Sequence, residues 1–341
     1  MKSYYRHILT AAAALLAVIG CTKTHEMPQN PEVSPICLSA TEAGRTKALL
    51  DADKFQNENN WIRVYDILTD QTVHINDRIS QSVTGTPLAE ATAGVWPFEH
   101  GPYQWTADTH KFFGWLDVDA NSGITANSFF NRELILSQTE NKLNSYVLEI
   151  PQVAFTKDTP QFDFMYSNIY ITEPINTPVP LEFSHLFSAF YITGLNRDSE
   201  NTVKVKEITL SGLNGTKSAQ IDFGGETTAV TYTDGKGNAT FSFTYAGELL
   251  STTAKALSEK YMIWPQTTED FADATLYIKY DYTSDGQTKE QERTIPLSSI
   301  GEWNAGVVNS INIAIDVDQI TFYINSLEDW NTEEKDIIVE M

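Results

Sequence analysis

The sequence of 341 residues contains only two cysteines, Cys21 and Cys37. If Cys21 carries a lipid, as its surroundings predict, Cys37 has no cysteine partner within the chain. Disulfide-rich secreted scaffolds need several such pairs, so that class is excluded. A hydrophobic content of 41% is instead typical of a chain that buries a large core.

Basic residues are also few, with 23 Lys and Arg against 45 Asp and Glu, and the formal net charge is −22. Loss of Lys2 and Arg6 with a signal segment would bring the mature form to −22 − 2 = −24. Such a surface repels nucleic acid and anionic membranes, so neither is an expected partner. Charged residues make up only 20% of the chain, which indicates a globular protein and not a disordered one.

Long apolar runs are missing beyond the N-terminus. Residues 8–19 form an apolar run after Lys2 and Arg6, and Gly20 precedes Cys21. This run is too short for a spanning helix, which needs about 20 residues, and the pattern predicts a signal peptide with a lipobox at residues 1–20. Cys21 is therefore the predicted lipidation site of an exported lipoprotein, which two or three acyl chains would anchor firmly. The alternative is an ordinary signal peptide followed by an incidental cysteine.

Catalytic constellations are also missing from the sequence. The six histidines are scattered singly, without the spacing of a zinc helix, and no nucleophile elbow or phosphate-binding glycine loop is present. We therefore expect no enzyme, no catalytic residue and no cofactor. His185 lies in an apolar run, and we interpret it as a core histidine with its hydrogen bonds satisfied. The histidines are His7, His25, His74, His100, His110 and His185.

One string of residues resembles the start of a calcium loop: Asp117, Asp119 and Asn121, followed by Gly123. A calcium loop of this kind needs Gly at its sixth position and Glu at its twelfth, where this chain has serines. A polar turn between strands is the preferred interpretation, and no metal site is predicted.

A dense group of aromatic residues lies between positions 96 and 115. It could form an exposed platform that stacks on sugars, but the alternation after Phe113 favours core packing. The group comprises Trp96, Phe98, Tyr103, Trp105, Phe112, Phe113 and Trp115.

Short segments that alternate apolar and polar residues recur along the chain and predict half-buried strands. Residues 311–317 are one example, and residues 276–282 with 292–295 form a predicted hairpin around Asp285-Gly286. Segment 252–261 is the best helix candidate. The predicted fold is all-β, with two sandwich domains. Further strands are predicted at residues 146–150, 203–210, 241–245 and 320–324.

Three prolines, Pro174, Pro178 and Pro180, indicate a boundary between the two domains. The expected organisation is a signal peptide, a tether with a removable N-terminal strand, an N-terminal sandwich and a C-terminal sandwich. The corresponding ranges are residues 1–20, 21–45, 46–178 and 179–341.

The Arg45-Thr46 bond lies in a stretch of small residues just ahead of the folded body, where a trypsin-like protease could reach it. Upstream, Ile36, Leu38 and Ala40 alternate with polar or small residues and predict an edge strand. Cleavage after Arg45 would detach this strand. A surface loop that happens to hold Arg45 is an equally weighted alternative.

Several of these stretches together resemble the fimbrillin family, the Mfa-like and FimA-like subunits of Bacteroides-type, type V fimbriae. The likeness follows nearly the whole mature chain in order. It is carried by the Arg45-Thr46-Lys47-Ala48 segment and by residues 96–97, 111–115, 163–166, 180–190, 261–266, 303–306 and 324–330.

This resemblance implies two transthyretin-like β-sandwich domains in a lipoprotein precursor at the cell surface. It further implies cleavage after Arg45 by an arginine-specific surface protease, followed by polymerisation with other fimbrial subunits through strand exchange. The C-terminus offers a donor-strand candidate, since Ile337, Val339 and Met341 share one face. The alternative function is a binding lipoprotein or fimbrial tip adhesin that recognises a glycan or a protein through exposed aromatic residues such as Trp96 and Trp105.

Overall fold

A computed structural model describes most of the chain between residues 35 and 339. Within this part, regular structure is almost entirely β, with a short 3-10 helix, η2 (Glu269–Phe271). No described helix is long and apolar enough to cross a membrane. The described residues are 35–42, 61–80, 95–119, 124–125, 130, 133–159, 162–235, 237–316, 320–327 and 337–339.

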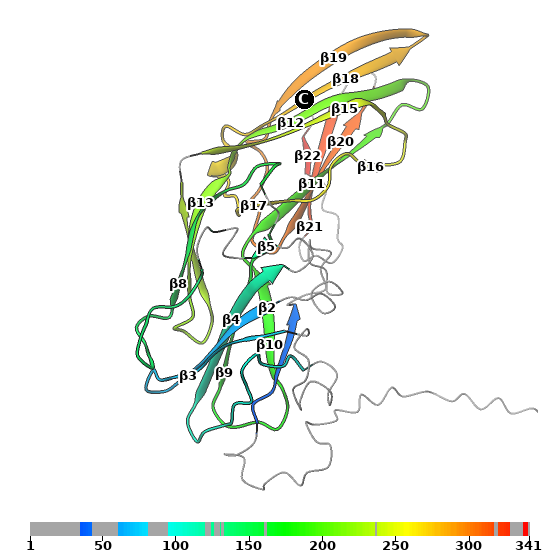
Figure 1. The fold of residues 1–341 in the computed structure, drawn as a ribbon. Coiled ribbons are helices and arrows are strands. Elements are labelled where there is room, and N and C mark those ends of the chain that lie inside the picture. The colour runs from blue at the N-terminus through cyan, green and yellow to red at the C-terminus, as the bar shows by residue number, and fades with distance from the viewer. Residues whose placement is uncertain are drawn as a thin grey trace, which may run out of the picture.

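A seven-stranded sheet, here called the N-terminal sheet, forms one end of the elongated molecule (Figure 1). Its strand order is β1-β10-β9-β4-β2-β3, and β5 pairs with β4. All of its pairs are antiparallel except β1 with β10. The strands are β1 (Leu38–Glu42), β2 (Trp61–Leu68), β3 (Val73–Ile79), β4 (His110–Asp119), β5 (Ile124–Thr125), β9 (Met165–Ile171) and β10 (Val179–His185).

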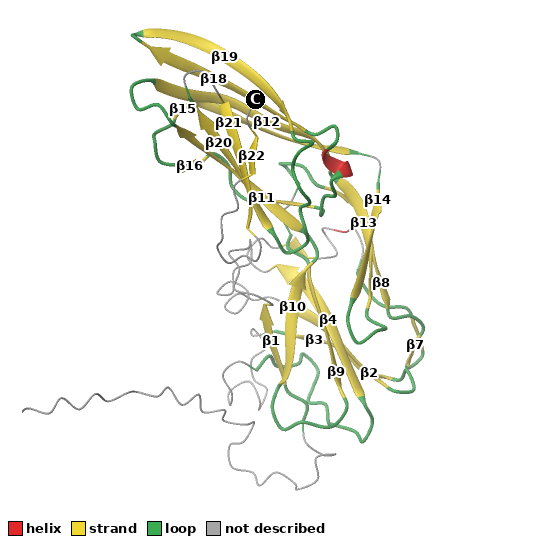
Figure 2. Cartoon of the chain, turned by 180° about the vertical axis from the view of Figure 1, so that it is seen from behind, coloured by secondary structure: helices red, strands yellow, loops and turns green. Residues whose placement is uncertain are grey.

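Two further sheets make up the opposite end (Figures 1 and 2). A six-stranded sheet has the order β16-β11-β20-β21-β22, with β17 paired to β11, and a four-stranded sheet has the order β15-β12-β18-β19. The first comprises β11 (Ser188–Asn196), β16 (Lys255–Ala256), β17 (Tyr261–Ile263), β20 (Val308–Ile315), β21 (Ile320–Leu327) and β22 (Ile337–Val339). The second comprises β12 (Thr202–Asn214), β15 (Asn238–Leu249), β18 (Thr275–Ser284) and β19 (Gln287–Pro296).

A three-stranded sheet of order β14-β13-β8 connects the two ends. Its strands are β8 (Val147–Ala154), β13 (Thr216–Asp222) and β14 (Ala229–Asp234), and a small hairpin joins β6 (Gln138–Thr139) to β7 (Lys142–Leu143). Phe223, directly after β13, stacks on Phe113 of β4 with ring centroids 4.8 Å apart. The three-stranded sheet therefore covers one face of the N-terminal sheet.

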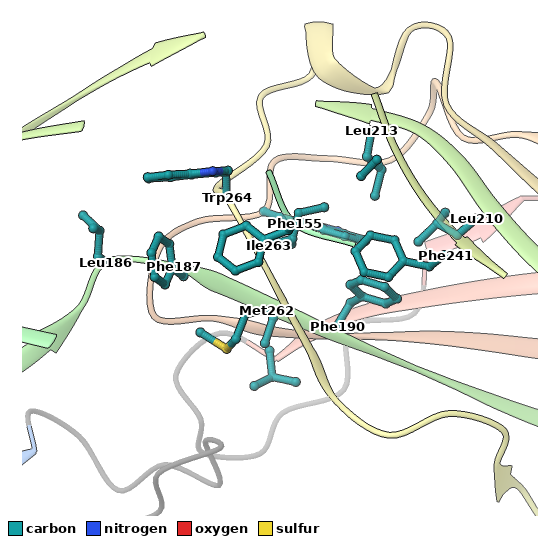
Figure 3. Packing of buried hydrophobic residues seen from close by; sticks show 14 of the residues in the cluster. Phe155, Leu186, Phe187, Phe190, Leu210, Leu213, Phe241, Met262, Ile263 and Trp264 are labelled. Atoms are coloured by element: carbon teal, nitrogen blue, oxygen red, sulfur yellow. The ribbon is translucent and has the colours of Figure 1, made fainter. Parts of the chain in front are cut away.

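The larger of two hydrophobic clusters, the main core, extends from the N-terminal sheet to the far end of the molecule. It includes Tyr65 and Trp115 at one end and Ile311 at the other. Near its middle, Phe187 meets Trp264 edge to face at 4.9 Å, and Phe190 meets Phe241 at 4.8 Å (Figure 3). Aromatic pairs in such geometry add to the free energy gained from burial alone. One continuous core thus joins both ends.

The all-β sandwich fold predicted from period-two patterning is confirmed, and so is the predicted hairpin. Strands β18 and β19 pair over ten positions around Asp285 and Gly286, whose φ angles of 50° and 73° are those of a two-residue hairpin turn. The helix expected at residues 252–261 is wrong. Its backbone instead bonds to β11, where Leu257 N–H donates to Ile192 O at 2.8 Å and β16 pairs with the strand.

The domain boundary expected between residues 178 and 179 stays a prediction. Strand pairing crosses that position in two sheets. Strand β10, which begins at Val179, pairs with β9 and β1 in the N-terminal sheet. Strand β8 precedes that boundary, yet it pairs with β13 beyond it.

The main core generates a stability prediction. Phe190→Ala removes a fully buried ring and should lower the free energy of unfolding by about 3–5 kcal/mol, the usual range for a Phe-to-Ala core substitution. Leu249→Ala is the control, because Leu249 is 55% exposed and a surface change shifts stability by about 0.5 kcal/mol or less. Chemical denaturation measures both variants, and equal effects would contradict the packing described.

Candidate functional site: the seat of the N-terminal strand

Strand β1 lies at the edge of the N-terminal sheet, parallel to β10, and the two are side by side in both views (Figures 1 and 2). Their register pairs Leu38 with Val179 and Glu42 with Phe183. Parallel strands cannot be joined by a tight hairpin, and β1 is remote in sequence from β10. The edge strand predicted at residues 36–40 is confirmed, with β1 beginning at Leu38.

The inward side chains of this segment are deeply buried. Ile36 and Leu38 have no exposed surface, and Ala40 is 2% exposed. They pack in the second hydrophobic cluster, the seat core, which lies on the face of the N-terminal sheet opposite the main core. Other members of the seat core are Ile62, Val64, Ile75, Ile79, Trp96, Phe98, Trp105, Phe112, Leu116, Met165, Val179, Leu181 and Phe183.

The outer edge of β1 is covered by residues 95–105, here called the cover loop. Trp96 N–H donates to Leu38 O at 2.9 Å, and Ile36 N–H donates to Tyr103 O at 2.8 Å. On the other side, Val179 N–H donates to Cys37 O at 2.8 Å. The N-terminal segment is therefore held from both sides, which shields an edge that could otherwise pair with another chain.

Asp77 of β3 anchors the cover loop. Its carboxylate is 1% exposed and accepts hydrogen bonds from the backbone N–H of His100 at 3.0 Å and from His100 Nδ1 at 2.8 Å. The hydroxyl of Tyr103 donates to the same carboxylate at 3.2 Å, and so does the N–H of Arg78 at 2.8 Å. A bidentate ion pair between Arg78 and Glu99 adds a second attachment.

These contacts shift two ionisation equilibria. The hydrogen bond to Asp77, with the charge of that carboxylate, raises the pKa of His100 above its usual value. Burial, and then the charge of Asp77, raises the pKa of Tyr103 to about 12. Tyr103 therefore stays a hydrogen-bond donor at physiological pH, while His100 gains affinity for a proton in the folded state.

Six of the seven aromatic residues named in the 96–115 stretch are buried in the core, as the alternation favoured, and Tyr103 is half-buried beside it. Trp96 is fully buried and Trp105 is 2% exposed. The expectation that these two tryptophans would contact a glycan in the alternative function is therefore wrong, because the seat core takes up their surface. Within the described part of the chain, the one aromatic residue among the exposed large apolar side chains is Tyr170, at 47%.

The polar string at residues 117–123 is described only as far as Asp119, and its interpretation as a turn stays a prediction. Strand β4 ends at Asp119 and pairs antiparallel with β5, which begins at Ile124; Asn121 and Gly123 lie outside the described residues. Asp117 is buried, and burial raises its pKa while the nearby Arg63 opposes that shift. Its carboxylate lies 4.0 Å from Arg63 Nη2.

His185 is a satisfied core histidine, as predicted, with Nδ1 at 2.9 Å from Asp163 Oδ1. Sequence reasoning missed another grouping: His74 and His110, 36 positions apart in the sequence, lie on either side of Asp66. Adjacent strands β2, β3 and β4 bring them together, and no short-range spacing signals that.

The predicted processing and lipidation residues Cys21, Arg45 and Thr46 lie outside the described residues, as does Met341. Ile337 and Val339 belong to β22, which pairs antiparallel with β21 at the edge of the six-stranded sheet. The donor-strand candidate therefore pairs within its own chain here, over three positions.

Comparison with known proteins places the chain in a family. The sequence profile described as Fimbrillin-like matches residues 46–330. The chain belongs to the fimbrillin-like family. It is thus a fimbrial subunit in the general sense, associated with the cell surface and cell adhesion. A search of curated proteins found no match.

Three of the solved structures to which the chain is similar come from Bacteroides and Porphyromonas species. A putative cell adhesion protein from Bacteroides uniformis is 15% identical, with 87% of this chain and 99% of that chain covered and a TM-score of 0.49. One from Bacteroides ovatus is 13% identical, with coverages of 89% and 99% and a TM-score of 0.47. The fimbrial anchor protein Mfa2 from Porphyromonas gingivalis is 11% identical, with coverages of 87% and 100% and a TM-score of 0.34.

The cover loop generates a prediction about pH. Because pairing with Asp77 raises the pKa of His100 above 6.5, the stability it contributes is fully present below about pH 6.5 and is lost as pH rises through the raised pKa. His100→Gln should therefore lower the melting temperature more at about pH 5.5 than at about pH 9. Thermal unfolding across this range measures it, and an equal deficit at all pH values would contradict the pairing.

Proposed function

We propose that this chain is a structural pilus subunit whose N-terminal strand, β1, can be replaced by a strand of another subunit. It is exported as an outer-membrane lipoprotein precursor acylated at Cys21, is cleaved after Arg45 by an arginine-specific surface protease, and polymerises when another subunit's strand takes the place of β1. The observation that supports this proposal most strongly is the way β1 is held. Its inward side chains are deeply buried, and no tight turn connects it to its neighbour β10.

The position of Arg45 supports this proposal. Strand β1 ends at Glu42, and Arg45 follows three residues later, before β2 begins at Trp61. A cut after Arg45 would break the covalent connection between the segment that contains β1 and the rest of the folded chain. Only hydrogen bonds and apolar packing would then keep residues 36–42 in place, and both can be replaced by an equivalent strand.

Energetics favour exchange over simple loss of the strand. Full burial of an Ile or Leu side chain is worth about 1.5–3 kcal/mol, and Ile36 and Leu38 are both fully buried. Departure of β1 would also leave the backbone groups of β10 unpaired at an apolar groove. An incoming strand that alternates apolar and polar residues restores both interactions, as in other cases of strand addition.

The C-terminal strand has features of a donor. Among the described residues, strand β22 pairs with β21 over three residue pairs, and its sequence alternation resembles that of residues 36–40. Transfer of this strand to a neighbouring subunit would join unlike surfaces, and such contacts build open filaments and not closed rings.

The alternative function of a glycan-binding tip protein has no comparable support. Its named contacts Trp96 and Trp105 are buried, so the aromatic platform on which it depended is absent from the described surface. A role at the tip through a protein partner would use the same strand seat.

Arg45→Ala should block processing. The variant is expected to remain a lipidated precursor that stays out of polymers, whereas Lys47→Ala, which removes the neighbouring basic residue, should be processed normally. N-terminal sequencing of surface material measures the outcome, with Thr46 expected as the first residue of the assembled form. Assembled fibres that contain only lipidated Cys21 at the N-terminus would refute the cleavage step.

A disulfide across the seat should block assembly after cleavage. Thr41 and Glu182 are register partners on β1 and β10, both are exposed, and neighbouring strands lie about 4.8 Å apart, within disulfide range. The Thr41→Cys/Glu182→Cys variant should be cleaved but should polymerise only after a reductant is added. Either single variant is the control, and polymerisation of the oxidised double variant at the normal rate would exclude departure of β1.

A further inference from the structure

Asp66, on β2, is a fully buried carboxylate between two histidines. Its Oδ2 atom lies 2.8 Å from His74 Nδ1 on β3 and 2.6 Å from His110 Nδ1 on β4. Neither the Asp66 nor the His110 side chain is exposed, and the His74 side chain is 21% exposed. The group lies at one end of the seat core, beside Trp105, whose ring is 4.8 Å from that of His110.

The second oxygen of this carboxylate is unsatisfied. Asp66 Oδ1 is buried and has no hydrogen-bond partner among the described residues. The ion pairs of Asp66 in the described part of the chain are those with His74 and His110, with no lysine or arginine involved. A buried carboxylate oxygen without a donor is costly, so this atom points to a ligand that supplies positive charge.

We propose that Asp66, His74 and His110 bind one divalent transition-metal ion, with zinc as the best match. Two imidazole nitrogens and one carboxylate oxygen form a donor set that suits Zn²⁺ and excludes the all-oxygen sites of calcium and magnesium. The three donor atoms all lie within 4.8 Å of one another. The half-buried ring of His74 gives the ion a route from solvent.

The geometry needs only a small adjustment. Ligand atoms about 2.0 Å from a tetrahedral ion lie about 3.3 Å apart, so the contacts of Asp66 Oδ2 with His74 (2.8 Å) and His110 (2.6 Å) must widen by about 0.5 Å and 0.7 Å. The ion would replace the protons on both Nδ1 atoms, which now hold the groups together as hydrogen bonds. Rotation of the Asp66 carboxyl group would bring the unsatisfied Oδ1 toward the same ion.

Thr106 provides the outer support that metal-bound histidines require. Its Oγ1 lies 3.0 Å from His110 Nε2, and its backbone N–H donates to the same nitrogen at 3.4 Å. With Nδ1 on the metal, Nε2 would carry the proton and would donate to the hydroxyl in place of that longer bond. Such partners fix the ring of a ligating histidine and raise metal affinity. Thr106 directly follows the cover loop, so the ion would connect β2, β3 and β4 with this loop at one end of the seat core.

A second group, Asp77, Glu99 and His100, offers similar ligand types, but it differs in hydrogen bonding and in exposure. Both oxygens of Asp77 already accept hydrogen bonds from described donors, and the His100 side chain is 70% exposed. We assign the metal to the Asp66 group alone, and His100→Gln is therefore the matched control.

The test is titration of the purified, chelator-treated protein with Zn²⁺ alone, by calorimetry and equilibrium dialysis. One equivalent should bind to the unchanged protein and to His100→Gln. Affinity should fall about tenfold in Thr106→Val, as for other outer partners, and at least about 100-fold in His74→Gln and Asp66→Asn. His74 is partly exposed, so His74→Gln should fold even if changes at the buried residues do not.

Two further measurements distinguish a metal ion bound at this site from one bound by other thiols or histidines of the chain. Co²⁺ should give the visible absorption of a four-coordinate nitrogen and oxygen site, which His74→Gln abolishes. Saturating Zn²⁺ should raise the melting temperature of the unchanged protein by about 5 °C and leave that of His74→Gln unchanged. Absence of one-to-one binding, or equal binding by His74→Gln, would overturn the assignment and leave a purely hydrogen-bonded histidine pair.

Discussion

Burial of one short strand against β10 is the constraint on which the N-terminal half of the molecule depends. Ile36, Leu38 and Ala40 complete the seat core, whose other walls come from the N-terminal sheet and the cover loop. The face of the sheet opposite this core is covered by β8, β13 and β14, through contacts such as Phe113 with Phe223. The folded body thus covers one face of the sheet. The other face is completed by β1, which is remote in sequence from its partner β10.

The two faces differ in how they are fastened. The face covered by β8, β13 and β14 uses large stacked rings and a lysine, Lys111, whose ammonium donates to Gly225 O at 2.7 Å. The seat uses backbone hydrogen bonds, two medium aliphatic side chains and a small one, with polar anchors at Asp77 placed beside the strand and not on it. The side chains that attach the cover loop thus lie outside β1 itself.

Sequence patterning anticipated much of this architecture. Alternation located β12, β15, β18, β20 and the N-terminal strand, and the Asp285-Gly286 pair located a turn, because these signals are local in the chain. The helix expected at residues 252–261 failed because pairing of this short segment with β11 outweighed its periodicity. The grouping of His74, His110 and Asp66 could not be predicted from the sequence, for another reason. It depends on the register of three strands, and their positions in the sequence carry no common spacing.

The parallel direction of β1 relative to β10 has a mechanical consequence. A force applied along a strand in such a ladder loads its hydrogen bonds together, in shear, whereas a force across a hairpin end opens them one by one. The parallel pair of β11 with β20, which spans eight residue pairs at the other end of the molecule, has the same property. Each end of this elongated fold therefore contains a parallel pair whose hydrogen bonds are loaded together when a force acts along the strands.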